Sequence, residues 1–268
     1  MVEVMKAHLF GILNYTPDSF YDGGKNNHQQ TILQTAQNLI DEGASFIDVG
    51  AEATNPFVEE LNAEEEIKRL TPVLPLLLHE FPEQISLDTY HPETLKWALR
   101  HGRPILNDVS GLHSPEMAKL VANNNLVCIV GHIPVSAGGI PIAAHSFNLD
   151  SFDAVVSEQI TNAEQLVRSG IAQESIILDP CIGFGKTMRL NWELVDNFAR
   201  VVDFPVMIGA SHKRLLGWSE STGEPLENSQ EIQHSKVKNV EVTQRALASG
   251  AQYLRVHEPA WYVDLVTM

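Results

Sequence analysis

The feature that most constrains the fold is a regular alternation of short apolar runs with longer segments of helical periodicity. We expect strands at the apolar runs, which are residues 9–13, 46–49, 85–87, 105–106, 126–130, 176–178, 206–208 and 253–256. We expect helices at 31–41, 63–81, 92–100, 115–122, 152–168, 192–201 and 240–249. The mean strand spacing, about 35 residues, is close to the roughly 31 of a typical (β/α)8 barrel. We therefore predict one α/β domain over residues 1–268, a (β/α)8 TIM barrel, with a doubly wound open sheet as the alternative.

Capping residues and glycines mark the expected helix boundaries. Asn62, His91 and Ser114 each precede good first-turn residues, so we expect them to be N-caps. Glycines that could end helices in a left-handed conformation lie at positions 43, 102, 170 and 250.

Composition limits where the protein works and what it binds. The chain is 44% hydrophobic and 19% charged, and no apolar run is long enough to cross a bilayer. The N-terminal stretch MVEVMKAHLFG lacks a signal-peptide core, so we expect a cytoplasmic protein. The net charge of −16 repels nucleic acids and anionic membranes, and we expect neither as a partner. Cys128 and Cys181 are predicted to be reduced, buried thiols.

Polar residues gather where the predicted strands end. They are Asn14, Asp48, Asp88, Asn107, Asp108, His132, Asp179, Ser211, Arg255 and His257. A single polar residue after a strand is usually a turn or cap residue. In a TIM barrel, however, the C-terminal strand ends form the face that carries the active site. We therefore expect these side chains to converge at one mouth.

The stretch SIILDPCIGFGKT, residues 175–187, is the most distinctive of these strand ends. Pro180 ends a buried strand directly after Asp179, and Gly183 and Gly185 allow tight turns beside the carboxylate. We interpret the stretch as a ligand floor followed by a flexible Lys186. It is not a phosphate-binding P-loop, because proline stands where that motif needs its first glycine.

The first predicted strand runs into GILNYTPDSFYDGG, residues 11–24, which resembles the first signature of the dihydropteroate synthase family. Some details, such as SLDTYHPET and RVHEP, are similar to the sulfonamide-resistant branch of that family. The other family signatures follow in the same order: IDVGAEATNP (47–56), SLDTY (86–90), LNDVSG (106–111), LDPCIGFGKT (178–187), GASHKRLLG (209–217) and LRVHEP (254–259).

The resemblance implies a pterin site. A pterin ring presents an amino group beside a ring N–H, and a carboxylate can accept both in parallel hydrogen bonds. An Asn amide or a Lys ammonium can serve the ring acceptors. The residues that the resemblance assigns to pterin binding are Asp179, Asn107, Lys213 and Asp88.

A cationic corner is predicted at the end of the last strand. Arg255 and His257 alternate along the strand, so we expect both to point the same way and to meet Lys213. Guanidinium and imidazole donors suit phosphate oxygens, so this corner suits a pyrophosphate. The resemblance implies that Asn14 ligates a Mg²⁺ ion bound to that pyrophosphate.

The reaction that the resemblance implies is attack of the p-aminobenzoate amine on the CH₂ carbon of 6-hydroxymethyl-7,8-dihydropterin pyrophosphate. The products are 7,8-dihydropteroate and pyrophosphate. A cationic pterin methylene forms as pyrophosphate leaves, so we expect mainly electrostatic catalysis. The expected catalytic residues are Asp88, Asp179, Lys213, Arg255 and His257. The expected p-aminobenzoate pocket comprises Phe20, Thr54, Pro56 and Ser211.

Three departures from the family pattern stand out. Thr54-Asn55-Pro56 replaces Thr-Arg-Pro, and Cys181 replaces a glycine. Ser211-His212-Lys213-Arg214 replaces Ser-Arg-Lys-Ser. We hypothesise that the Arg214 guanidinium binds the p-aminobenzoate carboxylate; the alternative is that it points into solvent.

Alternative functions remain open. One is a catalytically weak or inactive synthase paralogue, and another is a methyltransferase-type domain that binds methyltetrahydrofolate. A third is a pterin-binding or scaffold protein without activity. The resemblance also makes a homodimer possible, through helices near the C-terminus.

Overall fold

A computed structural model describes residues 7–15, 24–51, 61–133, 148–220 and 222–267. Its strands are β1 His8–Asn14, β2 Phe46–Gly50, β3 Ile85–Asp88, β4 Ile105–Asp108, β5 Cys128–Gly131, β6 Ile176–Asp179, β7 Met207–Ile208 and β8 Tyr253–Val256. The helices are α1 Gly24–Asp41, α2 Ala63–Leu70, α3 Leu74–Glu80, α4 Pro92–Ala98, α5 Pro115–Asn124, α6 Phe152–Arg168, α7 Met188–Val201, α8 Ser229–His234, α9 Lys236–Ser249 and α10 Val263–Val266. Short 3-10 turns are η3 Gln173–Ser175, η4 Arg214–Gly217 and η5 Pro259–Trp261.

The strands form a closed parallel barrel. They follow one another in the order β6-β5-β4-β3-β2-β1-β8-β7, and every pairing is parallel. A parallel bridge between Leu178 and Val206 joins the two ends of this order, and the Leu178 N–H donates to the Pro205 carbonyl at 2.8 Å. The predicted TIM barrel is confirmed, and the closure excludes the open sheet.

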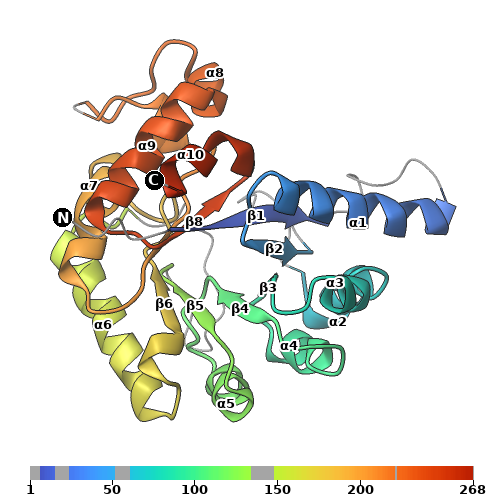
Figure 1. Cartoon of the computed structure of the whole chain (residues 1–268). Helices are drawn as coiled ribbons and strands as arrows, with labels where there is room; N and C mark the ends of the chain where they lie inside the picture. The colour runs from blue at the N-terminus through green and yellow to red at the C-terminus, as the bar shows by residue number, and fades with distance from the viewer. Residues whose placement is uncertain (1–6, 16–23, 52–60, 134–147, 221, 268) are drawn as a thin grey trace.

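The helices surround the strands (Figure 1), and their bounds differ from the prediction at several points. The segment 63–81 is two helices rather than one, because Pro75 stands in the first turn of α3. Helix α1 begins at Gly24 rather than at residue 31. Helices α7 and α9 each begin four residues earlier than expected. Thr187 and Ser235, whose hydroxyl oxygens accept backbone N–H groups, cap these two helices. The segment 218–235, for which no element was predicted, contains α8.

The expected caps are partly confirmed. The Asn62 side chain accepts the Glu65 N–H at 2.9 Å, and the Ser114 hydroxyl accepts the N–H of Met117 at 3.4 Å. His91 makes no side-chain cap, because its Nε2 lies 2.8 Å from the Leu61 carbonyl oxygen. Of the four predicted glycine stops, those at 43, 170 and 250 have positive φ angles of 100°, 102° and 104°.

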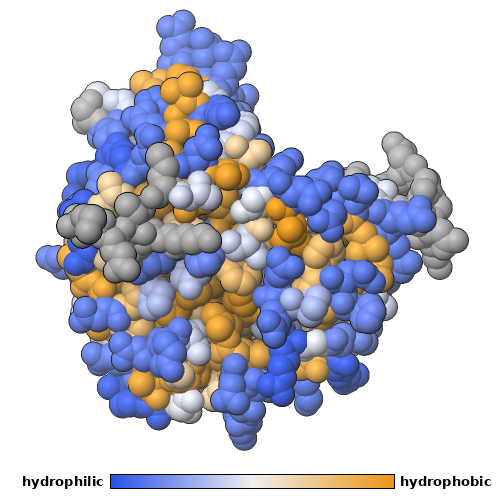
Figure 2. All heavy atoms as spheres, in the orientation of Figure 1, coloured by the Kyte–Doolittle hydropathy of each residue, from blue (hydrophilic) through white to orange (hydrophobic). Residues whose placement is uncertain are grey.

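Two hydrophobic clusters fill the molecule. The larger one joins the outer faces of the strands to the helices. The smaller one consists of Phe10, Ile129, Ile177 and Met207, which come from strands on opposite sides of the barrel and therefore meet in its interior. Figure 2 shows hydrophobic residues gathered toward the centre of this view, with hydrophilic residues around the rim.

Two residues further along the strands, the inward-facing residues are polar or small instead of apolar. Side chains alternate between the faces of a strand, so the positions after Ile177, Met207 and Tyr253 that also face inward are Asp179, Gly209 and Arg255. A polar layer with small residues therefore lies above an apolar one.

No helix in the described part of the chain has an apolar stretch of the length that a bilayer requires.

Candidate active site

A cavity of about 260 Å³ opens above the polar layer. It is bounded by the ends of β1 and β8 and by the loop after β7. Its lining includes Asn14, Ser211, Lys213, Arg255 and His257, all of which the sequence predicted for the site. Four further lining residues are Ile12, Gly209, His212 and His234. Arg255 and His257 thus face the same cavity, as their alternation along the strand implies.

Arg255 is paired with two carboxylates. Its Nε lies 2.6 Å from Asp48 Oδ2, and its terminal nitrogen lies 2.9 Å from Asp88 Oδ2. Burial opposes the charge of Arg255, but the two carboxylates outweigh burial and raise its pKa. The corner at Arg255 is therefore balanced by negative charge, whereas the sequence predicted a cationic corner.

Asp48 is the centre of this network. Its carboxylate is fully buried and accepts hydrogen bonds from the Ser86 hydroxyl at 2.6 Å and from Asn107 Nδ2 at 3.1 and 3.3 Å, besides Arg255. Sequence reasoning placed Asp48 among the strand-end residues at the mouth but assigned it no binding or catalytic role. The available signal was an acid inside the apolar run FIDVG, because a buried carboxylate needs a buried cation.

The two predicted pterin acids, Asp88 and Asp179, are hard to ionise in this environment. Burial raises the pKa of Asp88 to about 7, although Arg255 opposes the shift. Burial also raises the pKa of Asp179, while its hydrogen bond from the Cys181 N–H, at 2.7 Å, lowers it. A ligand that donates two hydrogen bonds to such a carboxylate would favour its charged form.

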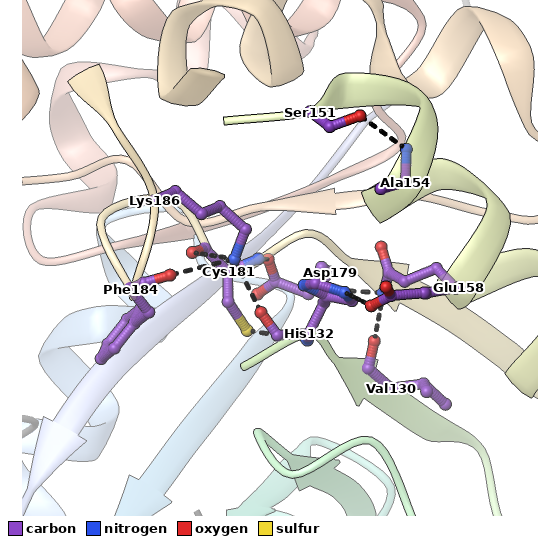
Figure 3. A network of polar contacts seen from close by, with 10 residues as sticks. Val130, His132, Ser151, Ala154, Glu158, Asp179, Cys181, Phe184 and Lys186 are labelled. Atoms are coloured by element: carbon purple, nitrogen blue, oxygen red, sulfur yellow. Dashed lines mark hydrogen bonds and ion pairs between the residues drawn. The ribbon is translucent and has the colours of Figure 1, made fainter. Parts of the chain in front are cut away.

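Lys186 holds the loop after β6 in place. Its buried ammonium donates to the carbonyl oxygens of His132 at 2.7 Å, Phe184 at 3.1 Å and Cys181 at 3.3 Å (Figure 3). The expectation of a flexible Lys186 is wrong, because three acceptors fix its charged end. Cys181 has a φ of 49°, in the left-handed region that glycine adopts without steric cost.

Lys213 reaches into the cavity across the loop after β6. Its ammonium lies 4.0 Å from the centre of the Phe184 ring, a cation–π contact. A Cβ added at Gly183 would lie 3.3 Å from Lys213 Cδ, so this glycine makes room for the lysine stem. Burial and the nearby Arg255 lower the pKa of Lys213 to about 8. The sequence analysis did not predict a role for Phe184, and the only sequence signal for it was its place between two glycines.

His257 is positioned by Ser211. Its Nδ1 lies 3.0 Å from the Ser211 hydroxyl oxygen, which also accepts the His257 backbone N–H at 3.3 Å. Burial, together with the neighbouring His212 and Arg255, lowers the pKa of His257 to about 3. His257 is therefore neutral at neutral pH, and Lys213 is the nearby cation that has no carboxylate partner among the described residues.

Phe20, Thr54 and Pro56 lie outside the described residues. Arg214 is exposed, with its guanidinium carbon 5.9 Å from the centre of the Trp218 ring. Asn14 Oδ1 is buried and has no hydrogen-bond partner among the described residues.

Polar strand ends also lie outside this cavity. His132 lines a separate cavity of about 440 Å³ between β5 and α6, where its Nε2 lies 3.1 Å from Glu158 Oε2. Asp108 accepts both the backbone N–H and the hydroxyl of Ser110, at 2.8 and 2.6 Å, and so forms a turn. These two residues have structural partners rather than a place in the central cavity.

The family model of pterin-binding enzymes matches residues 10–257 of the chain. The match covers every strand from the second half of β1 to β8, and with them the whole polar layer. The chain therefore belongs to the family of pterin-binding enzymes.

Individual relatives narrow this class. The dihydropteroate synthase of Escherichia coli K12 is 32% identical over 263 residues, 96% of this chain and 88% of the relative. That of Bacillus subtilis is 34% identical over 79% of this chain and 72% of the relative. The structure of Xanthomonas albilineans dihydropteroate synthase with 4-aminobenzoic acid superposes with a TM-score of 0.80 at 30% identity, covering 98% of this chain and 92% of that one. The chain belongs to the dihydropteroate synthase family.

Proposed function

We propose that this protein is a dihydropteroate synthase, a transferase that joins p-aminobenzoate to 6-hydroxymethyl-7,8-dihydropterin pyrophosphate in folate biosynthesis. The observation that carries the proposal is the convergence of acids and cations above the apolar barrel interior. Asp48 and Asp88 bracket Arg255 in this layer. A structure of the Xanthomonas albilineans enzyme contains 7,8-dihydropteroate, and it superposes on this chain with a TM-score of 0.79 at 29% identity.

Asp179 is proposed to recognise the pterin. Its Oδ1 accepts the Cys181 N–H, so this bond holds the carboxylate in one orientation. The amino group and adjacent N–H of a pterin can donate to such a fixed carboxylate in parallel. Asn107, whose Nδ2 is oriented by Asp48, and Asp88 contribute further polar groups to the same layer. Lys213 can donate to a ring acceptor from above.

The leaving pyrophosphate is proposed to occupy the cavity between Lys213, Arg255 and His257. Asn14 Oδ1 is a buried oxygen without a partner among the described residues, and such a neutral oxygen suits Mg²⁺. The described residues contain no group of three or more His, Cys, Asp or Glu side chains that could hold a metal. Asn14 and the phosphates would thus hold the ion, which supplies charge neutralisation when bound.

No protein nucleophile takes part in the proposed reaction. The C–O bond to pyrophosphate breaks, positive charge develops on the pterin methylene, and the aromatic amine forms the new C–N bond. Asp88 and Asp179 stabilise that positive charge, because preorganised carboxylates in a dry site do so most effectively. The amine then loses one proton to solvent or to the released pyrophosphate.

The proposed p-aminobenzoate pocket comprises Phe20, Thr54, Pro56 and Ser211. Arg214 is proposed to approach the carboxylate of p-aminobenzoate. Its exposed position is compatible with a ligand that enters from solvent, and equally with the solvent-facing alternative. Homodimerisation and a cytoplasmic location are likewise proposals, taken from the resemblance and from the composition.

The test is a coupled assay that follows pyrophosphate release from the pterin pyrophosphate and p-aminobenzoate, with and without Mg²⁺. Asp179→Asn should weaken pterin binding by about 3 kcal/mol, because an acceptor becomes a donor that faces a donor. His79→Gln, on the exposed face of α3, is the matched control. Pterin binding without turnover would indicate the inactive paralogue. Binding of methyltetrahydrofolate in preference to the pyrophosphate would indicate the methyltransferase-type domain.

A further inference from the structure

Three histidines from different parts of the chain meet at the rim of the central cavity. His212 follows β7, His234 ends α8, and His257 follows β8. The rings of His212 and His257 are stacked, with centroids 4.5 Å apart and an interplanar angle of 9°. The ring of His234 lies 4.8 Å from that of His212. The cavity lining includes all three.

His212 is held in a conformation that few residues adopt. Its φ of 56° lies in the left-handed region, which is uncommon for residues other than glycine, although Asn, Asp and His adopt it more often than most. Two hydrogen bonds secure this backbone: the His212 N–H donates to Asn239 Oδ1 at 3.0 Å, and Gln233 Nε2 donates to the His212 carbonyl. Contacts on both sides of the residue thus fix the backbone from which the ring projects.

The second imidazole, that of His234, has a defined tautomer. Its Nδ1 lies 2.8 Å from the Gln230 carbonyl oxygen, and a carbonyl can only accept, so Nδ1 carries the proton. The other nitrogen, Nε2, is therefore the one that gains a proton when the ring becomes charged. Each protonation adds one N–H donor and one positive charge at the rim.

Among the described residues of the lining, little positive charge is left unpaired to bind an anion. Arg255 is matched by Asp48 and Asp88, so Lys213 is the cation whose charge is left for a ligand among the described residues of the lining. A pyrophosphate carries several negative charges.

We propose that His212 and His234 form a proton-dependent anion site, in which they take up protons as a pyrophosphate binds beside Lys213 and His257. This inference deepens the proposed function, because it assumes that the cavity receives the leaving pyrophosphate. An anion stabilises a charged imidazole, so binding and protonation reinforce each other.

The charged and titratable groups that face His212 determine how readily its ring takes up a proton. They are Lys213 from its own loop, His234 from α8, Arg255 from β8, and His257 and Glu258 from the segment after β8. Burial and the adjacent His234 lower the pKa of His212, so the ring is neutral at neutral pH. His212 Nε2 lies 3.2 Å from Glu258 Oε2, where a protonated ring would gain an ion pair.

The experiment is calorimetric titration of the full chain with sodium pyrophosphate at pH 6.5 and 8.0, in buffers of different ionisation enthalpy. Wild type should take up about one more proton per pyrophosphate than His212→Gln/His234→Gln does. Its affinity should rise about tenfold from pH 8.0 to 6.5, relative to that variant. The ligand's own titration cancels in this comparison. His212→Arg should bind at both pH values with less proton uptake.

His79→Gln, an exposed histidine on α3, should behave as wild type. Equal proton uptake by wild type and the double variant would overturn the inference, as would undetectable pyrophosphate binding by wild type. The titration contains neither pterin nor p-aminobenzoate, so its outcome is separate from the synthase assay. An active synthase without the proton uptake overturns this inference alone. Proton uptake in a chain without turnover overturns the proposed function alone.

Discussion

Two layers of the barrel interior are built from the same strands and differ in nearly every physical respect. The lower layer holds Phe10, Ile129, Ile177 and Met207. The upper layer, two residues further along the strands, includes Asp179, Gly209 and Arg255. The two-residue repeat of a strand allows this change of character within one step. The lower layer stabilises the barrel, and the upper layer provides the chemistry.

The energetics of the two layers differ in kind. Apolar side chains in the lower layer gain free energy from removal of their surface from water. Charged groups in the upper layer lose hydration, and their attraction compensates only when each has a partner. Asp48 is fully buried, and its hydrogen-bond donors come from three other strands. The upper layer is therefore sensitive to the loss of any single partner.

The largest expected effect follows from removing the shared cation. Arg255→Met should lower the free energy of unfolding by about 4 kcal/mol, because it leaves the Asp48 carboxylate buried without its counter-charge. Urea denaturation at pH 7 measures this loss. Arg100→Met, at an exposed arginine, should change stability by less than about 0.5 kcal/mol.

A double variant sharpens the interpretation. Asp48→Asn removes the charge that Arg255→Met leaves unpaired, so the two losses should be less than additive, by about 1–3 kcal/mol. Strict additivity would mean that the two charges do not stabilise each other in the folded protein. The upper layer would then depend on packing, as the lower layer does.

The lower layer should respond without any effect on ligands. Ile177→Ala, at a side chain with 2% exposure, should cost about 3 kcal/mol through lost burial and a cavity. Pterin affinity, measured by calorimetry on the folded variant, should stay within about twofold of wild type. A large loss of affinity would contradict the separation of the two layers, since Ile177 lies one step below Asp179.

The pH dependence of stability should differ between the layers. Burial raises the pKa of Asp88 to about 7 from an ordinary 3.8, so the folded protein holds a proton that the unfolded chain has lost in this range. Stability from this proton is present at low pH and is lost as the pH rises through 7. Wild type should lose roughly 1–2 kcal/mol more than Asp88→Asn between pH 5 and 8.

The difference between wild type and Asp88→Asn isolates the contribution of the Asp88 carboxyl group. Asp108 and Asp179 also have raised pKa values, and their contributions have the same sign in both proteins. They cancel when the two unfolding curves are subtracted. If the curves of wild type and Asp88→Asn are parallel from pH 5 to 8, Asp88 is ionised throughout that range.

The barrel could be predicted from the sequence because its signals are local. Each apolar run is short and bounded by a turn residue, and period and spacing together indicate eight strands. The strand ends predicted part of the cavity lining, namely Asn14, Ser211, Arg255 and His257, because the fold gathers those ends at one mouth. The helix at 63–81 was predicted too long, since a proline in the first turn of a new helix resembles one that only bends a helix.

Pairings could not be predicted, because they depend on distances between strands. The apolar run around Asp48 indicates that this acid is buried, but no local signal identifies Arg255 as its partner, or Ser110 as the partner of Asp108. The contacts of Lys186 could not be predicted for the same reason, since its three acceptors lie on two different loops. Its place in a glycine-rich stretch indicated flexibility, and only the folded chain reveals the three carbonyl oxygens.

The smallest expected effect on stability tests whether the upper layer is shaped for a ligand. A Cβ at Gly209 would meet Arg255 Cβ at 3.6 Å and Asp179 Oδ2 at 3.9 Å, which are ordinary contact distances. Gly209→Ala should therefore change the free energy of unfolding by less than about 0.5 kcal/mol. The added methyl would occupy cavity space beside Asp179, so pterin affinity should fall. Gly131→Ala is the contrasting variant, because its Cβ would lie 2.5 Å from Val109 Cα and must displace backbone. If Gly209→Ala keeps both stability and pterin affinity, the pterin does not lie against this part of the upper layer.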